Sequence, residues 1–179
     1  MNEKDEVRAW ALRTAHAISE QRRGESDLAA MQRLLSLKAF QEAKTVFCYV
    51  SVGDEVSTRD IIKTAIGLHK TVCVPRCLPD YAMEAVAIND IEELENGLYG
   101  IPTVKKEGNI IPTSMIDLTV LPCLCADAEG YRIGYGKGYY DRFLTDYKGF
   151  SVVLCRKELL VDQIPVESHD QKVDFVIAT

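Results

Sequence analysis

A glycine-rich segment, residues 132–141, constrains the fold more than any other stretch of this chain. Its sequence is Arg-Ile-Gly-Tyr-Gly-Lys-Gly-Tyr-Tyr-Asp. The apolar, β-branched run at residues 116–121 predicts a buried strand before it, and residues 139–147 predict a helix after it. Glycine at every second position lets the backbone adopt positive φ and approach a ligand closely. A strand, a glycine-rich loop and a helix in this order predict an α/β fold whose loop binds an anion.

The charged side chains of this segment suit a polyphosphate ligand. Arg132 and Lys137 carry full positive charges, and the backbone N–H groups of the loop and of the helix start add partial ones. The spacing differs from both common phosphate-binding loops. A Walker A loop has a hydroxyl residue where Gly138 stands, and a dinucleotide fingerprint has its third glycine where Tyr139 stands. The segment therefore predicts a phosphate loop of a different kind, with a glycine-rich surface turn as the alternative.

The composition is ordinary for a soluble globular protein. The chain has 179 residues, 47% of them apolar and 27% charged, which suits one soluble domain with a substantial core. The net charge of −6 argues against nucleic-acid binding, and no apolar run is long enough to span a membrane. The six cysteines and three histidines lack the spacing of zinc ligands, so we expect reduced thiols and a cytoplasmic location. Small molecules are the expected partners of a monomer or homodimer.

Two helices are predicted at the beginning of the chain. Residues 3–23 carry apolar side chains at helical spacing, Gly24 ends this helix, and Ser26 can cap a second helix that runs to residue 43. Lys4 and Arg8, one turn apart, fall on a common face of the first helix. Spacing alone leaves two interpretations of this pair, a solvated basic edge or an anion-binding face.

Strands and helices alternate along the remaining chain. A third helix is predicted to open at Ser57, where Asp60 completes a capping box, and a helical turn is predicted at residues 91–94. Residues 105–112 read as a polar connection. The predicted strands are residues 45–50, 71–75, 83–88, 116–121, 150–155 and 174–178. This alternation predicts one α/β domain over residues 1–179, with a mainly parallel sheet between two layers of helices.

Residues 132–141 also carry a resemblance to a known family. The segment is similar to the Arg-Leu-Gly-x-Gly-x-Gly-Tyr-Tyr-Asp block of the 5-formyltetrahydrofolate cyclo-ligases, also called methenyltetrahydrofolate synthetases. Compatible segments occur at residues 4–8, 95–102 and 160–170. The resemblance implies a fold shared with sugar-phosphate isomerases of the ribose-5-phosphate type. It also implies conversion of 5-formyltetrahydrofolate to 5,10-methenyltetrahydrofolate, with ATP as co-substrate and Mg²⁺ as cofactor.

The resemblance implies an ATP site built from the chain's first residues and the glycine-rich segment. Lys137 is then the candidate for stabilising the charge that develops near the formyl oxygen, with Arg132 as a second catalytic residue. Unlike these two, most of the site is assigned by matching positions alone. The implied ATP-binding residues are Lys4, Asp5, Glu6, Val7, Arg8, Arg132, Ile133, Gly134, Tyr135, Gly136, Lys137, Gly138, Tyr139 and Tyr140.

Folate-binding and metal-binding residues follow from the same match. Glu55 stands where a carboxylate would hold the pterin's amino groups, and Tyr99 stands where an aromatic ring would stack on the folate. A solvated turn acid and a rim aromatic are the alternatives. The implied Mg²⁺ ligands, Asp141 and Asp170, have helix-end stabilisation and a turn as alternatives. The implied substrate-binding residues are Val50, Glu55, Tyr99, Tyr135, Gly136, Lys137, Gly138 and Tyr139.

The implied reaction explains why these parts are needed together. A formamide oxygen is a poor leaving group, so the γ-phosphate of ATP would first be transferred to the formyl oxygen. N10 would then attack the activated carbon, and phosphate would leave. Two other functions stay open, a sugar-phosphate isomerase that uses the loop for one phosphate and a folate-binding relative without turnover. The chain departs from the family pattern at Ala15, Thr103, Val104, Ala126, Arg156 and Leu159.

Overall fold

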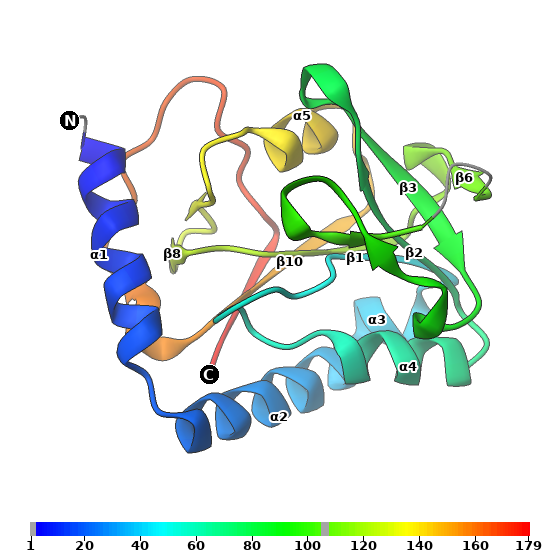
Figure 1. Cartoon of the computed structure of the whole chain (residues 1–179), viewed down its shortest axis with the longest axis horizontal. Helices are drawn as coiled ribbons and strands as arrows, with labels where there is room; N and C mark the ends of the chain where they lie inside the picture. The colour runs from blue at the N-terminus through cyan, green and yellow to red at the C-terminus, as the bar shows by residue number, and fades with distance from the viewer. Residues whose placement is uncertain (1–2, 105–107) are drawn as a thin grey trace.

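One twisted sheet, with strands from residues 45–178, lies at the centre of the structure (Figure 1). The computed structural model describes residues 3–104 and 108–179. In these residues the main sheet has seven strands in the order β12-β10-β7-β1-β2-β3-β6. The strands are β1 (Thr45–Cys48), β2 (Thr71–Cys77), β3 (Met83–Ile88), β6 (Ile110–Ile111), β7 (Leu118–Leu121), β10 (Phe150–Cys155) and β12 (Phe175–Ala178).

Most of this sheet is parallel, as the sequence predicted. β12, β10, β7, β1 and β2 pair in parallel, with Val46 opposite Val72 on one side and opposite Leu118 on the other. β3 runs antiparallel to β2 after a tight turn, and β6 continues antiparallel at the edge. The predicted connection at residues 105–112 was therefore wrong at its end, because β6 lies within it. Its first part, residues 105–107, lies outside the described residues.

Helices cover both faces of the sheet and make three layers. The helices are α1 (Glu3–Ala17), α2 (Glu20–Ser36), α3 (Lys38–Glu42), α4 (Arg59–Gly67) and α5 (Tyr139–Thr145). Figure 1 shows α2, α3 and α4 along one face, with α5 on the other face and α1 crossing beside β8. Buried Leu34, Phe40 and Ile62 form a core with the first face, while Ala11 and Phe143 belong to a second core. This arrangement confirms the predicted α/β class.

The first two helices meet at Ser19, not at Gly24 as the sequence predicted. The Ser19 side chain accepts a hydrogen bond from the Arg22 N–H at 3.2 Å and caps α2. Gly24 lies inside α2, where a glycine costs roughly 1 kcal/mol relative to alanine. Ser26 is buried rather than capping, and its hydroxyl lies 2.8 Å from the Thr179 hydroxyl. Gly24 is exposed and a Cβ there would meet nothing within 4 Å, so the cap at Ser19 determines where α2 begins.

The third predicted helix start was also wrong in its details. α4 begins at Arg59, and its N-cap residue Thr58 makes no side-chain capping bond to the helix. The buried Thr58 hydroxyl instead donates to the Tyr49 carbonyl at 2.7 Å and accepts from the Ser51 N–H at 3.0 Å. The predicted capping box is absent from this position because Ser57 and Thr58 join the helix start to the loop after β1. That loop therefore determines where α4 begins.

A short hairpin separates β7 from the glycine-rich loop. β8 (Cys125–Asp127) pairs antiparallel with β9 (Arg132–Ile133), and β11 (Leu160–Val161) completes a three-stranded sheet. The loop thus enters α5 from β9 rather than directly from the buried strand, which corrects the sequence prediction. α5 also ends at Thr145, two residues before the predicted end. The hairpin therefore lies between β7 and the glycine-rich loop, and the loop then leads into α5.

Short elements complete the chain. A two-stranded hairpin of β4 (Glu95–Asn96) and β5 (Pro102–Thr103) carries Tyr99 at its tip. The 3₁₀ helix η2 (Ile91–Glu93) confirms the helical turn predicted at residues 91–94. All six cysteines are free thiols. Among the residues described, none of the helices has both the length and the apolar character that a membrane span requires. The 3₁₀ helices are η1 (Pro79–Tyr81), η2 (Ile91–Glu93), η3 (Leu98–Gly100), η4 (Thr113–Met115) and η5 (Lys157–Leu159).

Candidate active site

A cavity of about 580 Å³ lies at the carboxyl ends of the parallel strands. Tyr49 and Val50 follow β1, Pro122 and Cys123 follow β7, and Cys77 ends β2. Ligands of open α/β sheets bind at this edge, because the loops that leave the strands there converge. The volume is within the range of sites that enclose small organic ligands. The cavity is therefore the candidate active site.

Most of the residues that the sequence singled out line this cavity. Residues 132–141 contribute ten consecutive positions, so the glycine-rich loop with its flanking residues forms one wall. The exceptions are Asp5, Glu6 and Val7 on α1, which do not line it, and their part in ATP binding stays a prediction. The other predicted residues in the cavity wall are Lys4, Arg8, Val50, Glu55, Tyr99 and Asp170.

Sequence reasoning missed a further group of lining residues. Some were signalled by their position at a strand's carboxyl end, as Cys77 and Cys123 are. Others, such as His169, lie inside segments whose neighbours had been chosen. The missed lining residues are Tyr49, Val52, Cys77, Ile101, Pro122, Cys123, Glu167 and His169.

Lys4 joins the first helix to the closing segment of the chain. Its Nζ lies 2.5 Å from Asp170 Oδ2 and 2.7 Å from Glu167 Oε2, and its side chain is 10% exposed. Burial alone would lower the pKa of Lys4, but the hydrogen bonds and charges of the two acids raise it overall. Burial would likewise raise the pKa of Asp170, yet the bonds from Lys4 and from the Glu167 N–H lower it. Both groups are thus held in their charged forms.

Arg132 and Asp141 form a second ion pair in the same wall. Arg132 Nη2 lies 3.2 Å from Asp141 Oδ1, and Nη1 donates to the Gln171 carbonyl at 2.9 Å. The Gln171 N–H donates to the same Asp141 oxygen at 3.2 Å. Because Gln171 follows Asp170, this bond draws the two predicted Mg²⁺ ligands toward one place. The guanidinium therefore ties β9, α5 and the closing segment together.

The carboxylates in this wall form a donor set that suits a hard cation. Among the described residues, hydrogen bonds reach Asp141 at Oδ1 and Asp170 at Oδ2. Asp170 Oδ1 lies 3.8 Å from His169 Nε2, so the second oxygen of each carboxylate accepts no described hydrogen bond. Potential ligand atoms of Glu167, His169 and Asp170 also lie within 4.8 Å of one another. Mg²⁺ prefers one or two carboxylates together with phosphate oxygens and water. Asp141 and Asp170 fit this preference.

Arg8 packs directly against the glycine-rich loop. Its Nε donates to the Gly134 carbonyl at 3.1 Å, and its Nη1 pairs with Asp5 at 2.6 Å. Gly136 has φ +87°, and a Cβ built there would lie 3.3 Å from Arg8 Cζ. Any other residue at this position would strain the backbone and crowd the guanidinium. The glycine thus permits the close approach of Arg8 to the loop.

The loop reaches α5 through Gly138 and is held there by Arg142. Gly138 is the N-cap of α5 with φ +69°, and a Cβ built there would lie 2.8 Å from Arg142 Nη1. The same Nη1 donates to the Lys137 carbonyl at 2.9 Å. The Lys137 side chain is exposed and extends over the cavity, which leaves its ammonium able to meet a ligand.

The Lys137 ammonium lies near Tyr99, one of a group of three aromatic rings. Lys137 Nζ lies 5.7 Å from the centre of the Tyr99 ring, within the range of a cation–π contact. Tyr99 meets Tyr139 edge to face at 6.3 Å between ring centres, and Tyr81 meets Tyr139 at 5.8 Å. Tyr99 has φ +58° and is 61% exposed. An exposed ring held on a strained backbone is available to stack on a flat ligand.

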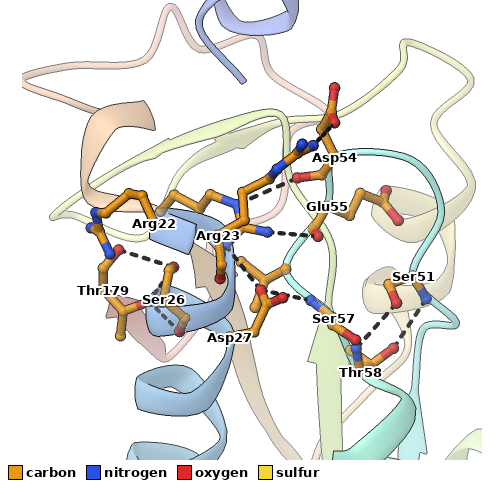
Figure 2. Close-up of polar contacts among 12 residues, drawn as sticks. Arg22, Arg23, Ser26, Asp27, Ser51, Asp54, Glu55, Ser57, Thr58 and Thr179 are labelled. Carbon is orange, nitrogen blue, oxygen red and sulfur yellow. Dashed lines mark hydrogen bonds and ion pairs between the residues drawn. The ribbon is translucent and has the colours of Figure 1, made fainter. Parts of the chain in front are cut away.

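Glu55, on the loop after β1, supplies a further carboxyl group to the lining of the cavity. Its Oε2 accepts a hydrogen bond from the Val52 N–H at 2.8 Å. Burial raises the pKa of Glu55 to about 7, although the Val52 hydrogen bond acts in the other direction. Figure 2 shows the loop that carries Glu55 between the start of α2, with Arg23 and Asp27, and the start of α4, with Thr58. A carboxyl group near neutrality can thus both accept and donate hydrogen bonds.

Sequence comparison finds known proteins that are similar to this chain over most of its length. The mouse (Mus musculus) 5-formyltetrahydrofolate cyclo-ligase is 32% identical over 96% of this chain and 91% of its own length. The Escherichia coli K12 enzyme of the same name is 27% identical over 90% of this chain and 92% of its own length. Both relatives thus match the chain nearly from end to end.

A solved structure and a protein-family model extend this result. The solution structure of Aquifex aeolicus 5,10-methenyltetrahydrofolate synthetase superposes with a TM-score of 0.87 at 27% identity, covering 98% of this chain and 89% of that one. The model of the 5-formyltetrahydrofolate cyclo-ligase family matches residues 1–179. A match over the full length, with relatives above 30% identity, leaves one assignment. The chain belongs to the 5-formyltetrahydrofolate cyclo-ligase family.

Proposed function

We propose that this protein converts 5-formyltetrahydrofolate to 5,10-methenyltetrahydrofolate, with ATP hydrolysed to ADP and phosphate. Membership of the cyclo-ligase family supports the reaction. The observation that carries the proposal is the single cavity that brings the glycine-rich loop together with Lys4, Glu55 and Asp170. One cavity can therefore hold a nucleotide's terminal phosphates beside a reduced pterin.

The nucleotide would bind where the cavity is basic. Lys4, Arg8, Arg132 and Lys137 line this part, and the loop between Arg132 and Asp141 lines the same space, where its backbone N–H groups would add to their positive charge. Phosphoryl transfer depends mainly on positioning and on neutralising charge at the phosphate oxygens. Arg8 and Arg132 are held by the loop carbonyl and by Asp141, so they are already oriented. Such preorganised cations would position the γ-phosphate.

Asp141 and Asp170 would hold Mg²⁺ against the phosphates. The oxygen that each leaves for a ligand belongs to a carboxylate fixed by other contacts, and such fixed carboxylates suit a small cation with strict geometry. Mg²⁺, when bound, would offset negative charge on the phosphate oxygens. Lys4 would then have to share Asp170, which it contacts in the structure described here.

The folate would bind between Glu55 and Tyr99. Tyr99 would stack on the flat pterin or on the aminobenzoyl ring, while Glu55 would accept hydrogen bonds from the pterin's amino and ring N–H groups. Val50, Tyr135 and Tyr139 also line the cavity and would complete the apolar walls around the rings. Gly136 and Gly138 let the loop approach the substrate closely.

The chemistry would take place where the two ligands meet. The formyl oxygen attacks the γ-phosphorus of ATP, the bond to ADP breaks, and a phosphate ester of the formyl group forms. N10 then attacks the formyl carbon, its proton passes to the departing phosphate, the carbon–oxygen bond breaks, and phosphate leaves with that oxygen. Lys137 would stabilise charge on the transferred group, with Arg132 beside it. Both cations lie in the wall that faces the cavity.

A direct assay tests this proposal. Purified protein is mixed with Mg-ATP and 5-formyltetrahydrofolate, and the near-ultraviolet absorbance of the methenyl product is followed together with ADP release. We expect product and ADP in equal amounts, and no product when ATP is omitted or Mg²⁺ is chelated. Turnover without ATP would point to an isomerase-like enzyme instead. Folate binding without ADP release would point to a binding protein.

Further features of the protein belong to the same proposal. A single domain over residues 1–179, kinship of the fold with sugar-phosphate isomerases, a cytoplasmic location and a monomeric or homodimeric state all stay predictions. The mainly parallel sheet and the full-length family match support the first of these. The others await measurement.

A further inference from the structure

Arg156 is a buried cation that lies outside the cavity but contacts the loop that lines it. It follows β10 directly, and its side chain is 2% exposed. Nη1 pairs with Asp27 Oδ1 at 2.9 Å and donates to the Arg23 carbonyl at 3.1 Å. On its other side, Nη2 donates to the Glu55 carbonyl at 3.0 Å and Nε to the Asp54 carbonyl at 3.4 Å. The guanidinium thus bridges α2 and two successive residues of the loop.

The same loop is anchored at its ends. Ser51 and Thr58 exchange two hydrogen bonds, at 3.0 and 3.1 Å, which close the base of the loop (Figure 2). Asp27 accepts from the Ser57 N–H at 3.1 Å with the oxygen that also faces Arg156. Besides these bonds at its base, the loop is therefore held by Arg156 and Asp27, which hydrogen-bond to its main chain at residues 54, 55 and 57.

The cavity side of this loop carries the proposed folate contacts. Val50, Val52 and Glu55 all line the cavity, whereas Arg156 does not. A shift of the main chain at Glu55 would move its carboxyl group relative to a bound pterin. Small displacements of a positioning group weaken ligand contacts without removing any group that touches the ligand.

We infer that Arg156 is a positioning residue for substrate recognition, which fixes the Glu55 carbonyl and so the place of the Glu55 side chain. This inference rests on the proposed function for the identity of the ligand. Arginine is suited to the role because its planar fork satisfies several acceptors in fixed directions at once. Lysine keeps the charge but offers a single ammonium, so it would satisfy Asp27 while leaving the loop carbonyls less well held.

Arg156→Lys is therefore the informative variant, and Arg22→Lys is its matched control. Arg22 lies on α2, the helix that Arg156 contacts. It donates two hydrogen bonds to Glu158, at 2.7 and 3.3 Å, and the described contacts of its side chain do not include the loop. Both variants lose an arginine fork and keep the charge. A general loss of packing at this end of the sheet would affect both, whereas loss of loop positioning would affect Arg156→Lys alone.

Steady-state kinetics supplies the first readout. We expect Arg156→Lys to raise the KM for 5-formyltetrahydrofolate by roughly 3- to 10-fold, the factor that one weakened hydrogen bond produces. The KM for ATP and kcat should stay close to wild type, because the glycine-rich loop is untouched. Asp27→Asn should act in the same direction, because it weakens the hold on Arg156 and on Ser57. Equal changes in both KM values, or none in either, would overturn the inference.

A double variant tests whether the effect passes through Glu55. In a Glu55→Gln background the carboxyl group is already replaced, so Arg156→Lys should raise the KM for the folate by a smaller factor than in the wild type. Fully multiplicative effects of the two substitutions would contradict a shared route.

Hydrogen exchange gives a readout that needs no activity. We expect the amides of residues 52–57 to exchange faster in Arg156→Lys than in wild type or Arg22→Lys, at conditions where all three are folded. If wild type shows no cyclo-ligase turnover, the proposed function fails, and exchange alone decides the positioning role. Exchange that is equally fast in both lysine variants would overturn that role even in an active enzyme.

Discussion

Lys4 and Asp170 lie 166 residues apart in sequence, yet their side chains meet at 2.5 Å in the wall of the cavity. Glu167 accepts a second bond from the same ammonium at 2.7 Å. α1 is thereby fastened to the closing segment of the chain, and a proposed ATP contact is neutralised by a proposed Mg²⁺ ligand. The charges that would hold the two ligands also stabilise the fold before either ligand binds.

Removal of this contact should weaken the fold in a pH-dependent way. Lys4→Ala leaves Asp170 without its charged donor, so we expect the free energy of unfolding near neutral pH to fall by roughly 1–3 kcal/mol. The pKa of Asp170 lies below its ordinary value, so the contribution is fully present above that ordinary value and is lost as pH falls through the lowered one. Because the pKa of Lys4 is raised, the contribution persists to alkaline pH.

Urea unfolding of the wild type and of Lys4→Ala, measured from neutral to strongly acidic pH, checks this expectation. Lys38→Ala is the control, because Lys38 and Glu42 form an exposed pair at 3.6 Å whose loss should cost only about 0–0.5 kcal/mol. A Lys4→Ala penalty that does not shrink in acid would show that Asp170 is not the partner that matters.

Gly136 and Gly134 offer a matched test of the loop. Gly136→Ala places a Cβ at positive φ and 3.3 Å from Arg8 Cζ, so we expect the loop and Arg8 to separate. Turnover should fall by about tenfold or more, since positioning carries phosphoryl transfer. A Cβ in Gly134→Ala meets no protein atom within 4 Å, so this variant should leave Arg8 against the loop and lose less turnover than Gly136→Ala. Steady-state rates at saturating ATP and folate, with circular dichroism of both variants, compare them. Equal losses would exclude the steric explanation.

Glu55 should make stability fall as pH rises toward neutral. Burial raises its pKa to about 7 from an ordinary value of 4.5, so the folded protein keeps a proton that the unfolded chain releases. The free energy of unfolding should therefore decrease between these values by roughly 2–4 kcal/mol and then stay level. Glu55→Gln removes the titration and keeps an acceptor for Val52. The variant should thus gain stability relative to wild type between pH 5 and pH 8.

Glu158→Gln is the control for this titration. Burial alone would raise the pKa of Glu158, but a backbone hydrogen bond and Arg22 lower it overall, so Glu158 is ionised throughout that range. Its stability difference from wild type should not change between pH 5 and pH 8. The same lack of change in Glu55→Gln would rule out a carboxyl group that titrates near neutrality.

Lys137 should matter for turnover and not for folding. Its side chain is exposed, and its described ring contact is with Tyr99, so Lys137→Ala should melt close to wild type. We expect kcat to fall by about tenfold or more, because charge on the transferred phosphate would lose a donor. Lys172→Ala is matched, since Lys172 lies 5.8 Å from the Tyr131 ring but does not line the cavity. A kcat that Lys137→Ala leaves unchanged would remove its proposed role.

The central strands could be predicted because their sequences determine them locally. The runs that became β1, β7 and β10 are apolar on both faces, as buried parallel strands require. The boundary between α1 and α2 could not be predicted, because the exposed Gly24 is tolerated inside α2 and Ser19 supplies the N-cap. β8 and β9 are too short to show a periodic pattern, and their pairing depends on residues 132–133 folding back.

The candidate site, like the fold, could be predicted only in part. The glycine-rich loop was visible as a motif, and it lines the cavity in the structure, while its binding of phosphate stays a prediction. Glu167 was missed because its role depends on Lys4, which no local pattern links to it. Arg156 was noted only as a departure from a family pattern. Its contacts with Asp27 and Glu55 join residues more than 100 positions away, and such contacts arise from the tertiary fold alone.

The proposed reaction requires transfer of phosphate to the formyl oxygen. 5-Formyltetrahydrofolate labelled with ¹⁸O in the formyl group is converted by the enzyme with unlabelled Mg-ATP, and the released phosphate is analysed by mass spectrometry. We predict that the phosphate carries the label in proportion to the methenyl product formed. Unlabelled phosphate, with the ¹⁸O released to water, would contradict the proposed reaction.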